Sequence, residues 1–166
     1  MMKKGFSLLE VIIYLSLVFI IVSVVAAFVF WLVASNSKNR LMIETLNSAE
    51  RALEIMVFEI RSAESVYTPT ATTSQISLQT KRHLPAGEDT AYLDFYLCGN
   101  KLCMKAESQD PVVLTPENME VSNLVFTYIV SGDNASVKVD ISVQNKNISG
   151  YEFSTALSSS ISLRSY

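Results

Sequence analysis

Glu10 is the residue whose position in this chain most needs a chemical explanation. It lies at the edge of an apolar run, and no charged residue occurs from Val11 to Ala34. A carboxylate drawn to the middle of a lipid bilayer costs up to about 2.5–3.5 kcal/mol, so such a group is by default functional and has a partner. The sequence therefore predicts a functional role for Glu10, with a partner still to be named.

The apolar run after Glu10 is long enough to cross a membrane. As a helix, Val11–Ala34 would be roughly 36 Å long at about 1.5 Å per residue, enough for a bilayer core. A helix is the form that lipid demands, because its backbone hydrogen bonds are satisfied internally. Lys3 and Lys4 precede the run. This placement favours a cytoplasmic N-terminus, with the chain after Ser35 on the far side.

Two ordinary interpretations explain this segment less well. A secretory signal peptide has an apolar region of about 7–15 residues with a small-residue cleavage site after it. Here the run is longer, and the small residue, Gly5, comes before it. A plain signal anchor would explain the lysines and the length, but it would gain nothing from Glu10.

The stretch KKGFSLLEVIIYLSL resembles the N-terminal signal of type IV pilins and type II secretion pseudopilins. The shared pattern is basic residues (Lys3, Lys4), then Gly5, Phe6, three residues, Glu10 and a long apolar helix. The resemblance implies that a prepilin peptidase cuts between Gly5 and Phe6 and methylates the amine of Phe6. Glu10 would then neutralise such an amine, on its own or a neighbouring subunit, and set the register of assembly.

The same resemblance implies a place and partners for the protein. Residues 1–5 would be the leader peptide and residues 6–34 the transmembrane helix of a single-pass cytoplasmic (inner) membrane protein. The expected partners are the prepilin peptidase, membrane lipid, the inner-membrane assembly platform, and other major and minor pilins bound through the N-terminal helix. The implied function is that of a minor pilin or pseudopilin, incorporated in, initiating or capping a type IV pilus or type II secretion filament.

An amphipathic segment follows the apolar run. Its apolar residues recur at alternating spacings of four and three, which predicts one helical face over residues 35–66. No Gly or Pro occurs from Phe6 to Val66, so one helix is predicted from about Ser7 to Ser65. The stripe predicts packing on the protein's own core, with a coiled coil to a partner as the alternative. Its members are Met42, Leu46, Ala49, Leu53, Met56, Ile60 and Ala63.

Residues 67–166 are predicted to form a β-rich extracytoplasmic domain. The segment TPTATTSQIS from Thr68 is typical of a loop. Alternating apolar and polar residues predict a hairpin over 91–98 and 101–105 around Gly99–Asn100, a second pair over 124–130 and 136–144, and a last strand within 151–163. The expected class is α+β, with the long N-terminal helix packed on an antiparallel sheet.

Two internal segments extend the resemblance. FYLCGNKLCMK resembles a hairpin of J-type minor pseudopilins and W-type minor pilins, and AERALEIMVFEIRSAESV resembles their helix. This implies a pilin-like fold. The helix residues that carry the likeness are Arg51, Ala52, Leu53, Glu59, Ile60, Arg61 and Ala63.

Cys98 and Cys103 flank the first hairpin turn. If the loop has four residues, from Gly99 to Leu102, the two cysteines face each other and can be bridged. If Gly99–Asn100 is a two-residue turn, they are expected to be diagonal and on opposite faces. A disulfide is the favoured interpretation, since the compartment outside the membrane permits one, and two free cysteines are the alternative.

Chemistry of other kinds is not indicated. His83 is the single histidine, and its place beside Lys81 and Arg82 is typical of a solvated loop side chain. No nucleophile elbow, phosphate loop, dinucleotide motif or EF-hand spacing occurs, so no enzyme activity, cofactor or metal is predicted. A net charge of −3 without a basic patch gives no reason to expect nucleic acid.

A second function stays open beside the filament protein. A membrane-anchored extracytoplasmic domain could bind a ligand without joining a filament. The stretch Gln79–His83 is the only short basic loop that would suit such a role.

Overall fold

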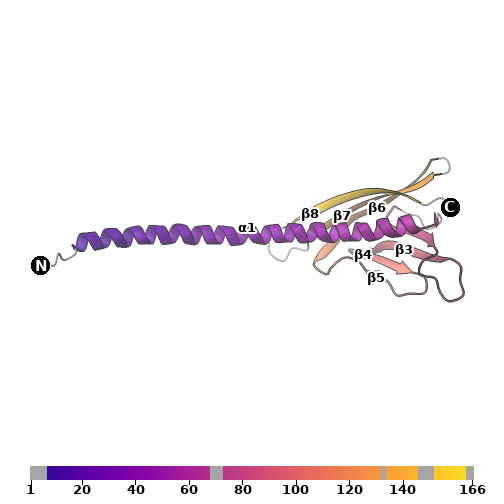
Figure 1. Cartoon of the computed structure of the whole chain (residues 1–166), viewed down its shortest axis with the longest axis horizontal. Helices are drawn as coiled ribbons and strands as arrows, with labels where there is room; N and C mark the ends of the chain where they lie inside the picture. The colour runs from indigo at the N-terminus through magenta and orange to yellow at the C-terminus, as the bar shows by residue number, and fades with distance from the viewer. Residues whose placement is uncertain (1–6, 68–72, 132–133, 146–151, 164–166) are drawn as a thin grey trace. The chain divides into compact units, whose positions relative to one another are not determined.

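The computed structural model describes residues 7–67, 73–131, 134–145 and 152–163. Over these ranges the chain is of the α+β class, with a long N-terminal helix and antiparallel strands (Figure 1). It divides into two compact units, residues 1–40 and 41–166. The elements are α1 (Leu8–Ser62), β1 (Ser65–Val66), β2 (Ile76–Thr80), β3 (Ala91–Cys98), β4 (Lys101–Ala106), β5 (Val112–Val113), β6 (Met119–Ser131), β7 (Asn134–Asn145) and β8 (Ser154–Ser162).

Helix α1 confirms the prediction of one helix through the polar stretch after Ala34. It ends at Ser62, earlier than predicted, because the chain turns there into strand β1. The Ala63 N–H still donates to the Ile60 carbonyl at 3.2 Å, and the Glu64 N–H already donates to the Gln79 carbonyl of β2 at 2.9 Å. Backbone groups that would have bonded within a further helical turn therefore bond to β2 instead.

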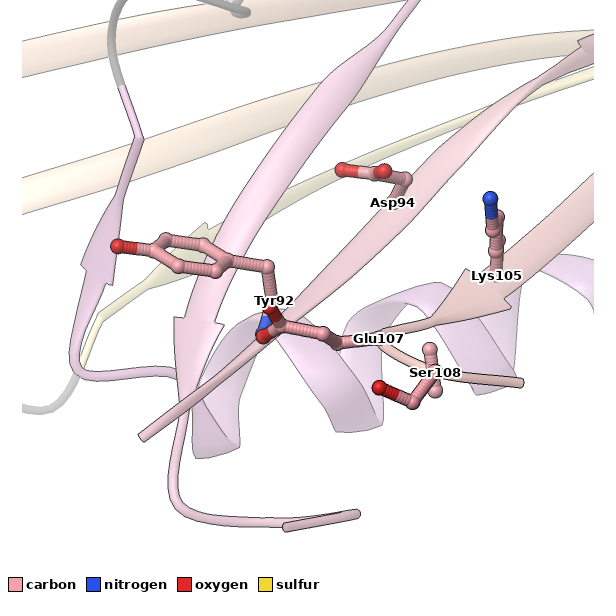
Figure 2. Close-up of a pocket in the computed structure, with 6 residues that line it drawn as sticks. Tyr92, Asp94, Lys105, Glu107 and Ser108 are labelled. Atoms are coloured by element: carbon pink, nitrogen blue, oxygen red, sulfur yellow. The ribbon is translucent and has the colours of Figure 1, made fainter. Parts of the chain in front are cut away.

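The strands form two antiparallel sheets, so the prediction of a single sheet is wrong. Five strands pair in the order β1-β2-β3-β4-β5, and three pair in the order β6-β7-β8. The two sheets approach each other at β4 and β6, where the Val121 N–H donates to the Asn100 carbonyl at 2.8 Å. In the five-stranded sheet, Asp94 of β3 lies opposite Lys105 of β4 on the face away from the core (Figure 2).

Strand β2 contradicts part of a sequence prediction. The stretch from Thr68 was expected to be a loop throughout, but Ile76 and Ser77 belong to β2 and are buried. Threonines and serines dominate the stretch, so its composition is typical of a loop and gives no signal for the start of this strand. Residues 68–72 lie outside the described ranges.

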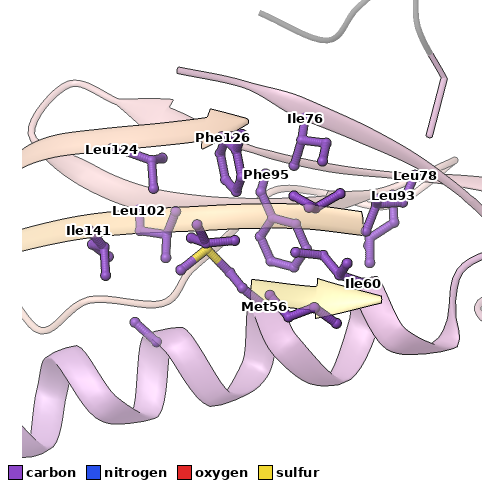
Figure 3. Close-up of a cluster of buried hydrophobic side chains, with 14 of the residues drawn as sticks. Met56, Ile60, Ile76, Leu78, Leu93, Phe95, Leu102, Leu124, Phe126 and Ile141 are labelled. Atoms are coloured by element: carbon purple, nitrogen blue, oxygen red, sulfur yellow. The ribbon is translucent and has the colours of Figure 1, made fainter. Parts of the chain in front are cut away.

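The second unit has one apolar core between the C-terminal part of α1 and both sheets (Figure 3). Met56 and Ile60 are fully buried against Phe95 and other side chains of the five-stranded sheet and of β6 and β7. Ala49, Ala52 and Ala63 bury the same helix face, and their small side chains allow close approach of the strands. The stripe is therefore a core face, as predicted, while Met42 near its start is 48% exposed.

A β-bulge in β6 explains how one long strand keeps its core face. Met119 and Val121 are buried before the bulge, and Leu124 and Phe126 are buried after it. The register against β7 shifts between Val121 and Asn123. One extra residue restores the alternation that would otherwise turn the apolar side chains outward.

Candidate functional site

Glu10 lies in the first turn of α1 and is half-buried. The helix begins just before it, and the N–H groups of Glu10 and Val11 donate to the Ser7 carbonyl at 3.0 and 3.2 Å. A carboxylate in a first helical turn lies near the positive end of the helix dipole. Lys3, Lys4, Gly5 and Phe6 lie outside the described residues. The prediction that Glu10 pairs with an amine at Phe6 therefore stays a prediction.

The helix beyond Glu10 carries apolar side chains on every side. From Val11 to Val33 its large apolar residues are exposed all round, and this part of α1 is long and apolar enough to cross a membrane. Burying one such side chain is worth about 1.5–3 kcal/mol. Many of them together outweigh the penalty of one carboxylate, which is about 2.5–3.5 kcal/mol even at mid-bilayer. Glu10 therefore does not prevent insertion of this segment into lipid.

Cys98 and Cys103 lie at disulfide distance, with their Cα atoms 5.9 Å apart. Cys98 lies opposite Lys101 in the ladder, so the turn is the two-residue Gly99–Asn100. Gly99 has a φ of 66°, the sign that such a turn requires at its first position. The expectation that a two-residue turn separates the cysteines onto opposite faces is wrong. Cys98 of β3 shares a face with its partner Lys101 of β4. Cys103 lies two residues after Lys101 in β4, so it is on that face too.

Lys101, beside this turn, joins the hairpin to the segment that leads into β6. Its Nζ donates to the carbonyls of Pro116, Glu117 and Met119, the second of these at 2.9 Å. The Leu102 N–H donates to the Thr115 Oγ1 at 3.2 Å, and the Leu114 N–H donates back to the Leu102 carbonyl at 2.8 Å. An ammonium that meets three carbonyls satisfies all of its donors. The cysteine pair thus lies beside Lys101, the residue that makes these bonds.

Glu59 is a buried carboxylate whose partners were not predicted from the sequence. Its side chain is only 8% exposed, on the core side of α1. Arg82 Nε lies 3.6 Å from one carboxylate oxygen, and His83 Nε2 lies 3.6 Å from the other. The Arg82 guanidinium also lies 4.5 Å above the ring of Phe58. A buried carboxylate is tolerated when a cation such as Arg82 faces it.

This arrangement corrects the interpretation of the basic stretch Gln79–His83. Gln79 and Thr80 are part of β2, and only the residues from Lys81 onward form a loop. Lys81 Nζ lies 2.5 Å from Glu64, while Arg82 and His83 face Glu59. His83 is an exposed loop residue, as predicted, and its ring also faces Glu59. Lys81 and Arg82 of this loop thus pair with Glu64 and Glu59, and both side chains remain exposed to solvent.

The described residues contain no group of three or more metal-ligating side chains. Comparisons with protein-family models, with curated proteins and with solved structures gave no significant match. The features that bear on function are thus the apolar part of α1 with Glu10 at its start, and the polar groups of the folded second unit.

Proposed function

We propose that this chain is a structural minor pilin or pseudopilin. In this proposal a prepilin peptidase removes residues 1–5 and methylates the amine of Phe6. The protein then sits in the cytoplasmic (inner) membrane by a single span, with a cytoplasmic N-terminus and an extracytoplasmic C-terminal domain. From the membrane it enters a type IV pilus or type II secretion filament, in the shaft or at the tip, through contacts with other pilins.

The observation that carries the proposal is the combination at the start of α1. Glu10 stands in the first turn, and the apolar side chains after it are exposed on every side of the helix. A membrane anchor accounts for the apolar residues but gives no reason for a carboxylate. Assembly accounts for both, because a helix bundle in lipid must neutralise each subunit's terminal amine. The folded second unit supports a structural role, since the buried carboxylate of Glu59 faces Arg82 and His83 of the same chain.

The alternative of a ligand-binding module that never joins a filament had rested on the basic loop. The cations of that loop face Glu59 and Glu64 of the same chain, so this feature no longer favours the alternative.

The test of the proposal is Glu10→Val. Insertion should persist, because the apolar run becomes longer, and cleavage should persist, because Gly5 and Phe6 are unchanged. Association with the sibling pilins should fail or slow, since an unpaired buried charge costs about 3–5 kcal/mol when its partner is removed. Glu10→Asp should be intermediate, because the charge is kept and the reach is shorter.

The measurement is cross-linking of the chain to its siblings in membranes, scored beside cleavage. Glu54→Val is the matched control, because Glu54 is exposed on the part of α1 that belongs to the second unit. If Glu10→Val cross-links as well as the wild type, Glu10 has no role in assembly and the signal-anchor interpretation is the better one.

A further inference from the structure

The outer face of the five-stranded sheet carries polar side chains that the core does not use. Ser77, Asp94 and Lys105 lie side by side across β2, β3 and β4 on this face. Tyr92 stands in the neighbouring row beside Gln79. The inward residues of the same strands, such as Leu93 and Phe95, fill the core instead. The polar rows therefore lie outside the apolar core.

A depression of about 230 Å³ lies on this face (Figure 2). The residues that line it carry one aromatic ring, two carboxylates, one ammonium and two hydroxyls. The volume is below the range of about 300–1,000 Å³ that is typical of pockets for drug-sized ligands, so the depression suits a single small unit. The lining residues are Tyr92, Asp94, Lys105, Ala106, Glu107 and Ser108.

Hydrogen bonds fix this wall before any ligand is present. The Tyr92 N–H donates to Glu107 Oε2 at 3.0 Å, and the Glu107 N–H donates to the Tyr92 carbonyl at 2.8 Å. The Ser77 hydroxyl donates to Asp94 Oδ1. The Tyr92 ring packs against Tyr67 with the ring centres 5.2 Å apart. Groups held in this way lose little freedom when they bind a ligand.

The charged groups of the depression keep unused hydrogen-bonding capacity. Among the described residues, no ion pair joins Lys105 to Asp94 or Glu107, although Lys105 lies directly opposite Asp94 in the ladder. A carboxylate has about four lone-pair sites, and the bonds above occupy only some of them. Three charged side chains around one depression thus have donors and acceptors to offer.

We propose that this depression binds one sugar residue of a glycan. A sugar ring has hydroxyl groups that both donate and accept, which matches carboxylates, an ammonium and a hydroxyl placed around one ring. Its C–H face is apolar and suits the exposed face of Tyr92, a rigid side chain that is 36% exposed here. A lysine or arginine side chain would match the carboxylates and the aromatic ring, but Lys105 would repel it. The mixed signs therefore favour a neutral polyhydroxylated ligand, independently of the filament proposal.

The test is fluorine NMR of the full chain labelled with 3-fluorotyrosine. The protein is kept in a polyoxyethylene detergent, so that no sugar headgroup competes. Tyr92 is one of seven tyrosines, and its signal is assigned by its loss in Tyr92→Phe. The probes are maltotriose, triacetylchitotriose and galactotriose, each up to ~10 mM, a concentration that nearly saturates a site with a Kd of about 1 mM. N-acetyl-lysine amide is the cationic comparison.

At least one trisaccharide should move the Tyr92 signal in a saturable way. Asp94→Asn and Lys105→Gln should each weaken that binding about tenfold, since they remove a charged hydrogen-bonding partner. The amide oxygen introduced by Asp94→Asn can still accept from the Ser77 hydroxyl, so the sheet is kept. Asp89→Asn, an exposed carboxylate in the loop before β3, should change nothing. The proposal is overturned if no trisaccharide moves the signal, if both pocket variants bind as the wild type does, or if only the lysine derivative binds.

Discussion

At the scale of single residues, this protein places carboxylates where each needs a specific partner. Glu59 is enclosed at the end of α1 and faces Arg82 and His83 from one loop. One of its oxygens, Oε2, has no hydrogen-bond partner and lies 3.6 Å from the Arg82 Nε. In the proposed function, Glu10 is a second such carboxylate, at the start of an apolar helix. A partner decides whether such a charge stabilises or destabilises its surroundings.

Replacement of Arg82 tests the first of these pairs. Arg82→Ala leaves the Glu59 carboxylate with His83 alone and removes the guanidinium from the ring of Phe58. Because the Arg82 side chain is 44% exposed, we expect a loss of about 1–2 kcal/mol in the free energy of unfolding, below the full value for a buried pair. Urea unfolding of the detergent-solubilised chain, followed by circular dichroism, measures it.

Arg51→Ala is the control, since Arg51 is exposed on the same helix and should cost less than about 0.5 kcal/mol. Adding Glu59→Gln to Arg82→Ala should recover part of the loss, because the buried charge is then gone. Equal losses for Arg82→Ala and Arg51→Ala would show that Glu59 does not depend on Arg82.

Asp140 is expected to make the stability of the fold depend on pH. Hydrogen bonds from Ser158 and Lys138 hold the pKa of this carboxyl below its ordinary value. A lowered pKa in the folded state gives stability that is fully present above the unfolded pKa of about 3.9 and is lost as the pH falls through the folded value. The Tm difference between wild type and Asp140→Asn should thus be constant above about pH 5 and shrink below about pH 4. A difference that stays the same down to about pH 2 would contradict this.

At the scale of elements, helix α1 changes its surface along its length. Its N-terminal part is apolar all round, whereas its C-terminal part carries a single apolar face that enters the core of the second unit. Two methionines on the same predicted stripe lie in opposite environments. Met56 is fully buried, and Met42 is 48% exposed.

These two methionines form a matched pair of substitutions. Met56→Ala should lower the free energy of unfolding by about 2–5 kcal/mol, because it removes buried apolar surface and leaves a cavity. Met42→Ala should change it by less than about 0.5 kcal/mol. Chemical unfolding of both variants measures the difference. Similar losses would mean that the whole stripe is buried against a partner, as in the coiled-coil alternative.

The sequence predicts elements well where one periodicity runs without interruption. Helix α1 and strand β3 follow such patterns, and their residues could be placed from the chain alone. Strand β6 was predicted only after Asn123, because the bulge breaks the alternation at that point. Strands β1 and β5 have two residues each, which is too short for any periodic signal. Pairing with a neighbouring strand, β2 for β1 and β4 for β5, decides them.

The contacts of the candidate sites were less predictable than the elements. Glu59 could be noticed as a carboxylate close to the apolar stripe, but its partners come from a loop that follows strand β2. Nothing local in the sequence links Glu59 to Arg82 and His83. In the same way, the outer-face depression brings together Tyr92 of β3 and Glu107, which follows β4. Only the register of β3 against β4 sets that distance.

At the scale of the whole molecule, the chain consists of two compact units whose surfaces differ in character. The first unit exposes apolar side chains along a helix of membrane-spanning length. The second has its own core and hydrogen-bonded sheets. An exposed apolar surface of that extent marks a region that lipid or other proteins cover. In the proposed function, lipid covers it before assembly and neighbouring pilins cover it afterwards.

The most direct test of this account is the mass of the N-terminal peptide of the protein isolated from membranes of its native cell. The account predicts a chain that begins at Phe6 and carries one methyl group on its amine. Gly5→Val should leave the precursor uncut, because the peptidase must approach the backbone at a residue without a side chain. An intact Met1, or a chain that begins after Ala26 or Ala27, would contradict the account and leave a signal anchor or a signal peptide in its place.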